Sequence, residues 1–322
     1  MALSLLFGLL ALLASRHLLT LALLGGAVVS GELIARHGFG WGTPPLYLAD
    51  PLTEYKLKPD QKLRRYGNRI EVNGTSMRSA PLSARRFPGS RRVLVFGDSV
   101  VWGGSVLDQE KIATEWLRQA GISEVGNVAA PSWGPGNWLG YARRFGFQQA
   151  TEVVLVISSH DAADNPSPEP FRGGTNHPVE PPTSALREGV ERYLFPRLGL
   201  PFPPLTISLD SDSSEPSSRS DPRVQQGLAD LRAFLQLARA SGARVVAVQF
   251  PDREEARSGK LEAGNRWIAQ LLSQEAIPSL QAGPIFSSCG PIDSLYTDEI
   301  HPYSAAGQAC LAKAIQQALA IP

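Results

Sequence analysis

A serine, an aspartate and a histidine stand in this sequence where they could form a nucleophilic site. Ser99 lies in the segment 97–100 (Gly-Asp-Ser-Val), directly after the apolar run 93–96 (Val-Leu-Val-Phe). Asp298 and His301 lie three residues apart near the other end of the chain. A serine hydroxyl becomes a strong nucleophile when an imidazole removes its proton and a carboxylate orients that imidazole. The sequence therefore predicts Ser99 as nucleophile, His301 as general base and Asp298 as the residue that orients the ring.

Other chemistries that leave a recognisable local pattern are disfavoured. The five histidines are scattered without His-Glu-x-x-His spacing and there are two cysteines, so we expect neither a metal site nor a cofactor. Residues 134–140 contain three glycines, but one residue too many precedes the third for a dinucleotide-binding turn. The chain has no Gly-x-Ser-x-Gly turn and no Gly-Lys-Ser/Thr loop. With a net charge of +1, it is expected to have no nucleic-acid partner.

The serine needs a strand before it and a helix after it, and the surrounding sequence supplies both repeatedly. Apolar runs predict strands at 92–97, 124–129, 152–158, 243–249 and, as a short fifth strand, 279–285. Helical patterns alternate with them at 108–120, 136–149, 222–240, 256–275 and 303–320. This alternation predicts a parallel sheet with helices on both faces. Ser99 would then lie at the carboxyl edge of the sheet, where open α/β sheets carry their chemistry.

Two segments resemble motifs of a known family. Residues 95–99 (Val-Phe-Gly-Asp-Ser) and 298–302 (Asp-Glu-Ile-His-Pro) are similar to the first and last motif blocks of the SGNH (GDSL) hydrolases. The resemblance extends over residues 90–320. It implies a flavodoxin-like α/β/α sandwich with a five-stranded parallel sheet, and hydrolysis or sometimes transfer of acyl esters.

The second motif block of that family is matched more loosely. Residues 127–132 (Asn-Val-Ala-Ala-Pro-Ser) resemble it, and Ser132 stands where the family has a glycine whose backbone N–H serves the oxyanion hole. The resemblance implies that Ser99 and Ser132 each give a backbone N–H to this hole. Ser132 can do so if it adopts the backbone angles of that glycine.

The third block departs further from the family. Residues 158–161 read Ser-Ser-His-Asp where the family has Gly-x-Asn-Asp, so His160 replaces the asparagine that completes the oxyanion hole. An imidazole N–H can donate to an oxyanion, but its reach and protonation differ from those of an amide. Three interpretations stay open: His160 is the substitute donor, it is structural while Asn165 or water donates, or the site is weakened.

Substrate contacts are expected from the loops around Ser99. Trp102, Trp133 and Trp138 fall in such loops, and aromatic faces suit sugar rings or acyl chains, although tryptophans also fill cores. We take Trp102, Trp133 and Asn137 as candidate substrate-binding residues.

A long insertion at residues 161–222 is rich in proline and serine. Its centre, 184–198, could form a helix, whereas 208–221 is acidic, serine-rich and expected to be mobile. The insertion follows a central strand at its carboxyl end, so it could cover the site as a lid or form a wall that binds the acyl acceptor. Alternatively, it is a surface loop without a role in the reaction.

The N-terminal residues 1–37 predict a membrane anchor. Residues 2–15 are apolar, Arg16 and His17 interrupt, and 18–29 are apolar again. One helix from 18 to 34 would just span a membrane, which takes about 20 residues. A cleaved signal peptide and a hairpin of two short helices are alternatives; no clear A-x-A cleavage site is present, which favours an uncleaved anchor.

The remaining chain divides into a basic extended lead-in at 38–90 and a catalytic domain at 91–322. Residues 54–92 carry eleven Lys or Arg against three Asp or Glu, which suits either a solvated face or attraction to anionic lipids or an acidic glycan. The resemblance to anchored hydrolases implies an extracytoplasmic catalytic domain. Cys289 and Cys310 flank the Asp-His segment and would pair in an oxidising compartment, or remain two buried thiols.

Taken together, these features predict a membrane-anchored serine esterase. Its partner would be an acyl-ester substrate on a cell-surface carbohydrate or lipid. Two alternatives use the same sequence: an acyltransferase in which a sugar hydroxyl replaces water, and a non-catalytic glycan-binding module in which His160 marks the loss of activity.

Overall fold

The computed structural model of the 322-residue chain describes residues 2–174, 176–198 and 218–321. These residues belong to two compact units. The first comprises residues 1–44, 64–67 and 181–204, and the second comprises 45–63, 68–180 and 205–322. The expected site residues Ser99, Asp298 and His301 all lie in the second unit.

The second unit is built on one five-stranded sheet. Its strands are β5 (Arg92–Gly97), β6 (Glu124–Ala129), β7 (Glu152–Ile157), β8 (Arg244–Gln249) and β9 (Ser279–Gln281). They run in the order β6-β5-β7-β8-β9, and every neighbouring pair is parallel. This is the 2-1-3-4-5 order of flavodoxin-like folds. The α/β fold class and the five-stranded parallel sheet are therefore confirmed.

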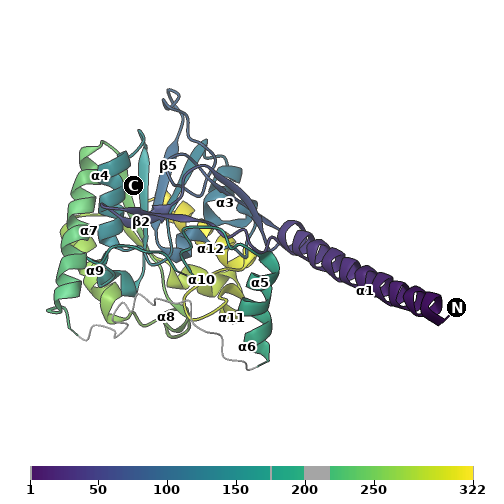
Figure 1. Cartoon of the computed structure of the whole chain (residues 1–322). Coiled ribbons are helices and arrows are strands. Elements are labelled where there is room, and N and C mark those ends of the chain that lie inside the picture. The colour runs from purple at the N-terminus through teal and green to yellow at the C-terminus, as the bar shows by residue number, and fades with distance from the viewer. Residues whose placement is uncertain (1, 175, 199–217, 322) are drawn as a thin grey trace. The chain divides into compact units, whose positions relative to one another are not determined.

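Helices cover both faces of this sheet (Figure 1). One face carries α4 (Pro135–Phe145), α7 (Pro222–Ala240) and α9 (Ala263–Gln274), and the other carries α3 (Ala113–Gln119) and α12 (Ala305–Leu319). Strands β5 and β7 are buried along their whole length, as expected for strands covered on both faces. The core is continuous through the sheet, which fixes the strand ends that carry the site.

Two of the predicted helices were wrong in extent. The pattern at 256–275 is two helices, α8 (Arg253–Ser258) and α9, because Gly259 adopts φ 68° and ends α8. The pattern at 108–120 is a 3₁₀ turn, Gln109–Lys111, followed by α3, with Ile112 extended between them. The fifth strand was predicted too long, because β9 ends at Gln281 and helix α10 (Gly283–Cys289) begins two residues later. Helices α10 and α11 (Ile292–Leu295) were not predicted.

The lead-in contains strands rather than one extended segment. Strand β1 (Tyr47–Asp50) pairs antiparallel with β2 (Glu54–Leu57), and β3 (Gln61–Arg65) pairs with β4 (Asn68–Val72). Apolar side chains of β1, β2 and β4 join the same hydrophobic core as the large sheet. These three strands of the lead-in therefore pack on the core of the large sheet.

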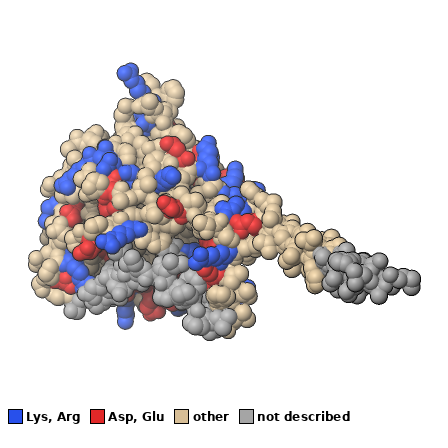
Figure 2. All heavy atoms as spheres, viewed as in Figure 1, with Lys and Arg blue, Asp and Glu red and all other residues tan. Residues whose placement is uncertain are grey.

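Several basic residues of the segment 54–92 form ion pairs with acidic residues of other segments. Arg92 contacts Glu124 at 2.7 Å, and Arg91 contacts Glu152 at 2.7 Å. Over the face in Figure 2, basic and acidic side chains are interspersed. This pairing favours the interpretation of a solvated, internally balanced surface.

In the first unit, α1 (Ala2–Leu33) is continuous and leads into a π-helical turn, Ile34–Phe39. The alternative of two short helices in a hairpin is therefore wrong. Residues Ser15–Phe39 form one helix that is long and apolar enough to cross a membrane. The most apolar 18-residue stretch of this helix has a mean hydropathy of 1.9, and 6% of it is buried. A membrane anchor and a signal sequence both meet this description.

The centre of the 161–222 insertion is helical, as predicted. It comprises α5 (Ala185–Gly189), a π-helical turn (Val190–Leu194) and α6 (Phe195–Arg197), and it belongs to the first unit. Within that unit Arg65 and Glu188 form a buried ion pair at 2.5 Å. Most of the segment expected to be mobile, 208–217, lies outside the described residues, so its mobility and the lid role stay predictions.

Candidate active site

Ser99 begins helix α2 (Ser99–Trp102) directly after β5. The Asp98 side chain caps this helix by accepting a hydrogen bond from the Val100 N–H at 2.8 Å. Gly97 makes the sharp turn possible, because a Cβ at this position would lie 2.4 Å from the Val101 side chain. The turn brings the Ser99 hydroxyl out of the sheet at its carboxyl edge.

The loop between α11 and α12 brings Asp298 and His301 to this serine. His301 Nε2 lies 2.8 Å from Ser99 Oγ, and His301 Nδ1 lies 2.7 Å from Asp298 Oδ2. Ser99 and His301 lie about two hundred residues apart in the sequence, and the fold joins them with Asp298 in one series of hydrogen bonds. In the tautomer that fits, Nδ1–H donates to Asp298 and Nε2 accepts from the serine hydroxyl.

The Asp298 carboxylate is held in place by its own loop. Its Oδ1 accepts hydrogen bonds from the backbone N–H groups of Ile300 at 2.9 Å and His301 at 2.8 Å. Burial raises the pKa of Asp298, but these hydrogen bonds and the contact with the His301 ring outweigh it and lower the pKa below its usual value. Asp298 is therefore ionised at neutral pH, as an acceptor for the imidazole must be.

Two residues that sequence reasoning missed tie the serine to the histidine. Tyr303 stacks on the His301 ring, with 4.5 Å between ring centroids, and its hydroxyl donates to the Ser99 carbonyl at 3.1 Å. Gln308 is fully buried, and its Nε2 donates to the carbonyls of Val100 at 3.1 Å and Pro302 at 3.2 Å. A glutamine among the apolar positions of the last helix was the available sequence signal for Gln308.

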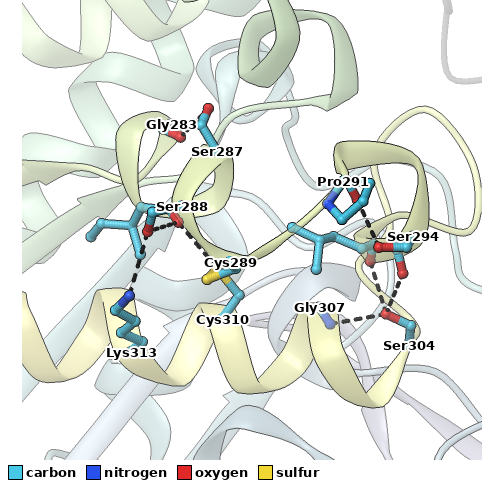
Figure 3. Close-up of a disulfide and its surroundings, with 12 residues drawn as sticks. Gly283, Ser287, Ser288, Cys289, Pro291, Ser294, Ser304, Gly307, Cys310 and Lys313 are labelled. Atoms are coloured by element: carbon cyan, nitrogen blue, oxygen red, sulfur yellow. Dashed lines mark hydrogen bonds between the residues drawn. A yellow bond between two sulfur atoms is a disulfide. The ribbon is translucent and has the colours of Figure 1, made fainter.

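A disulfide braces the same loop. Cys289 in α10 is bonded to Cys310 in α12, with 6.0 Å between their Cα atoms (Figure 3). The bond closes a segment of chain that contains both Asp298 and His301. Of the two alternatives left open by the sequence, the structure has the pair.

The proposed backbone donors have suitable surroundings. Ser132 has φ 58°, in the left-handed region that glycine adopts easily, so it does take up the angles of the glycine it replaces. Neither the Ser99 N–H nor the Ser132 N–H has a hydrogen-bond acceptor among the described residues. Both residues line the same cavity. Their roles in an oxyanion hole remain a proposal.

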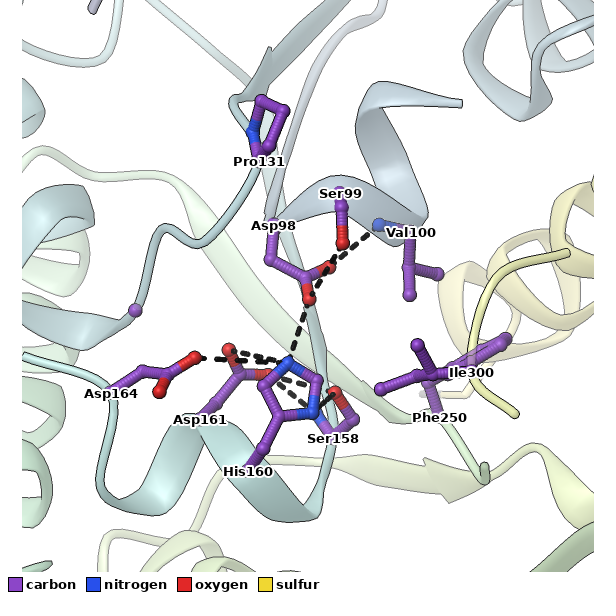
Figure 4. Close-up of polar contacts among 12 residues, drawn as sticks. Asp98, Ser99, Val100, Pro131, Ser158, His160, Asp161, Asp164, Phe250 and Ile300 are labelled. Carbon is purple, nitrogen blue, oxygen red and sulfur yellow. Dashed lines mark hydrogen bonds and ion pairs between the residues drawn. The ribbon is translucent and has the colours of Figure 1, made fainter. Parts of the chain in front are cut away.

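His160 does not present a free donor beside Ser99. Its Nε2 lies 2.9 Å from Asp98 Oδ2, and its Nδ1 lies 3.2 Å from Ser158 Oγ (Figure 4). Burial lowers the pKa of His160, but Asp161, Asp98 and Asp164 more than compensate and raise the pKa to about 10. When no metal ion occupies this place, the His160 ring is therefore protonated on both nitrogens. Its Nε2–H donates to Asp98 and is not directed at Ser99.

Asn165 does not supply the missing amide donor either. Its Nδ2 donates to the carbonyls of Ala163 at 2.8 Å and Arg223 at 2.9 Å. Asn165 is also absent from the residues that line the cavity at Ser99. Of the candidate donors described, the backbone N–H groups are left to serve an oxyanion.

The cavity beside Ser99 has a volume of about 380 Å³ and a polar wall. Five carboxylates and two histidines line it together with four serines and a single aliphatic residue, Ile300. The carboxylates are Asp98, Asp164, Asp252, Glu262 and Glu299. A wall of this composition favours a hydroxyl-rich or cationic group over a long hydrocarbon chain.

The expected aromatic platforms lie elsewhere. Trp102 and Trp133 are 3% and 1% exposed, and Trp133 Nε1 donates to the Tyr55 carbonyl at 3.0 Å. Asn137 is 1% exposed. Its Nδ2 donates a hydrogen bond to the Thr53 carbonyl, and its Oδ1 accepts one from the Gly134 N–H. None of the three candidates lines the cavity. They hold the lead-in against the core, because in this fold the loops after β5 and β6 are covered.

No protein-family model matches the sequence, and no curated protein matches it. Among solved structures, the chain is similar to TesA with 18% identity and a TM-score of 0.44, covering 71% of this chain and 98% of that chain. It is also similar to a member of the lipolytic G-D-S-L family from Veillonella parvula, with 10% identity, a TM-score of 0.44 and coverage of 71% and 97%. A third is a catalytic mutant of Axe2, an acetylxylan esterase from Geobacillus stearothermophilus, with 13% identity, a TM-score of 0.43 and coverage of 73% and 96%.

Proposed function

We propose that this chain is a serine ester hydrolase. The observation that carries the proposal is the hydrogen-bonded series from Ser99 Oγ to His301 Nε2, at 2.8 Å, and from His301 Nδ1 to Asp298 Oδ2, at 2.7 Å. A serine in such a series attacks acyl carbonyls, because the base is already in contact with the proton it must take.

The reaction then follows from the positions of these groups. Ser99 Oγ bonds to the acyl carbon while its proton passes to His301 Nε2, and His301 returns the proton to the leaving alcohol. Water attacks the acyl-serine with the same base and releases the carboxylic acid. The backbone N–H groups of Ser99 and Ser132 would meet the negative oxygen, and one such donor contributes about 3–4 kcal/mol.

The substrate that fits best is a short acyl ester of a carbohydrate. The polar wall of the cavity supports this choice, since carboxylates accept hydrogen bonds from sugar hydroxyls and, among the described residues that line it, Ile300 alone is aliphatic. The expected surface lipid is a weaker fit, because a long acyl chain needs an apolar channel.

We further propose that the protein is anchored in a membrane, with the catalytic unit outside the cytoplasm. The apolar helix Ser15–Phe39 supports the anchor, and the Cys289–Cys310 disulfide supports an oxidising compartment. Alkaline phosphatase and green fluorescent protein fused after Pro322 test the orientation. Phosphatase activity with a dark fluorescent protein is expected, and the opposite pattern contradicts it.

A fluorophosphonate probe tests the chemistry on the full-length chain in detergent. We expect the wild type to be labelled and to hydrolyse acetylated sugars, and Ser99→Ala to do neither. Ser159→Ala is the matched control, because Ser159 lines the same cavity but touches neither Asp298 nor His301. Equal labelling of Ser99→Ala contradicts the proposal. Acyl-sugar formation from a donor and a glycan acceptor would assign transfer to the same serine.

A further inference from the structure

A second group of ionisable side chains lies next to Ser99 and is not used by the reaction described above. It comprises Asp98, His160, Asp161 and Asp164, from the ends of β5 and β7 (Figure 4). Asp98 and Asp161 are buried, at 2% and 0% exposure. Three carboxyl groups thus surround one imidazole.

The atoms of this group converge on one point. From His160 Nε2, the distances are 2.9 Å to Asp98 Oδ2, 3.8 Å to Asp161 Oδ1 and 3.9 Å to Asp164 Oδ2. Ligands of a transition ion bound at about 2.0–2.2 Å are separated by roughly 3.0–3.5 Å. The ligand atoms of Asp98, His160 and Asp161 all lie within 4.8 Å of one another, so side-chain shifts of about an ångström would bring these three to ligand spacing.

The hydrogen bonds around the group leave the required atoms available. Ser158 Oγ donates to Asp161 Oδ2 at 3.1 Å and can accept from His160 Nδ1–H at 3.2 Å. This arrangement places a proton on Nδ1 and turns Nε2 toward the carboxylates, as in metal sites where a partner fixes the other ring nitrogen. Asp98 caps α2 through Oδ1, which accepts a hydrogen bond from the Val100 N–H. Its Oδ2 is therefore left to face His160.

An oxygen without a partner provides independent support. Asp161 Oδ1 is buried and has no hydrogen-bond partner among the described residues, although its side chain is otherwise well fixed. A buried oxygen of this kind destabilises the fold unless a donor or a cation satisfies it. It faces the His160 ring at 3.8 Å, on the side where the other two carboxylates lie.

We propose that Asp98, His160 and Asp161, with Asp164 at the open side, bind a divalent first-row transition ion such as Zn²⁺. Mixed imidazole and carboxylate ligands suit such an ion, whereas Ca²⁺ and Mg²⁺ favour oxygen ligands alone. The ion takes the place of the proton between His160 and Asp98. This site was not expected from the sequence, because its residues come from two separate segments, and it adds to the proposed hydrolase function.

An ion bound at this site would lie close to the atoms that take part in the proposed reaction. Asp98 Oδ2 lies 3.5 Å from Ser99 Oγ, so the bound charge is close to the carbonyl oxygen that Ser99 would activate. A metal held by His160 would therefore offer positive charge to the cavity that Ser99 and His160 both line.

Isothermal titration of the chelator-treated, full-length protein with Zn²⁺ tests the site. We expect one ion per chain, and at least a 100-fold loss of affinity in Asp161→Asn and His160→Asn, because even outer-sphere partners cost 10- to 100-fold. Glu299→Gln is the matched control, since it removes one charge from the same cavity wall outside the group. Ser99→Ala should bind Zn²⁺ as the wild type does, so failure of the hydrolase proposal is distinguishable.

Two results would overturn the site. One is the absence of binding by the wild type, and the other is wild-type affinity in both ligand variants. If a variant unfolds, the visible spectrum of the wild type loaded with Co²⁺ decides the question. Nitrogen and oxygen ligation of a shielded Co²⁺ is expected, and a spectrum of hydrated Co²⁺ contradicts the proposal.

Discussion

Gln308 offers a strong test of how the fold holds the nucleophile and base together. Its Nε2 bonds the carbonyls of Val100 and Pro302, the residues that follow Ser99 and His301, and its Oε1 accepts the Ala113 N–H at 2.9 Å. One side chain thus joins the two segments that carry the proposed serine and histidine.

The change Gln308→Met keeps the length of the side chain and removes all three hydrogen bonds. Gln308 is fully buried, so its three partners would be left without water to replace it. At about 1–1.5 kcal/mol for each bond, the free energy of unfolding should fall by about 3–4 kcal/mol. A displacement of Ser99 from His301 near 1 Å would lower kcat by roughly 100-fold, with KM little changed.

Urea unfolding followed by tryptophan fluorescence measures the stability, and ester turnover measures kcat and KM separately. Gln316→Met is the control, because Gln316 is exposed on the same helix and its replacement should cost less than about 0.5 kcal/mol. A loss below about 1 kcal/mol together with wild-type kcat in Gln308→Met would refute the reasoning.

Three further changes probe the supports of the site. Replacing Cys289 and Cys310 by serine should lower the free energy of unfolding by about 3 kcal/mol, because the bond closes a loop of 21 residues; reductant should produce the same loss in the wild type, and equal stability would contradict the pairing. Arg78→Met should lower the free energy of unfolding by about 3 kcal/mol or more in urea, since the buried guanidinium donates to the carbonyls of Trp102 at the end of α2 and of Gly104 and Leu107 in the loop that follows; unchanged stability would contradict this role. His160 has a pKa of about 10 against 6.5 unfolded, raised by Asp98 and the neighbouring aspartates, so in metal-free protein its stabilisation is complete below pH 6.5 and is lost as pH rises through 10. His160→Asn should lack this loss in urea titrations between pH 7 and 10, and parallel curves would contradict the assignment.

The sequence predicted the sheet well because its strands are short apolar runs that any parallel arrangement must bury. It predicted Ser99, Asp298 and His301 because their spacing and order carry the chemistry. The helix boundary at Gly259 was missed, since a single glycine within a helical pattern does not by itself reveal that the residue adopts a left-handed conformation and ends the helix.

Residues that act through long-range contacts were beyond the sequence. Gln308 and Arg78 bond backbone carbonyls of distant segments, and nothing in their local sequence names those partners. Trp102 and Trp133 were expected in the cavity because their loops follow β5 and β6. The packed lead-in buries them, and its strands carry too few apolar positions to be recognised in advance.

Ser99 is the residue on which the proposed hydrolase activity depends most. Intact-mass measurement of the protein after fluorophosphonate treatment, followed by peptide mapping, examines this directly. We predict one adduct per chain on Ser99, none in Ser99→Ala, and at least 100-fold slower labelling in His301→Gln, because the serine then lacks its base. An adduct on another residue, or labelling of His301→Gln at the wild-type rate, would contradict the central claim.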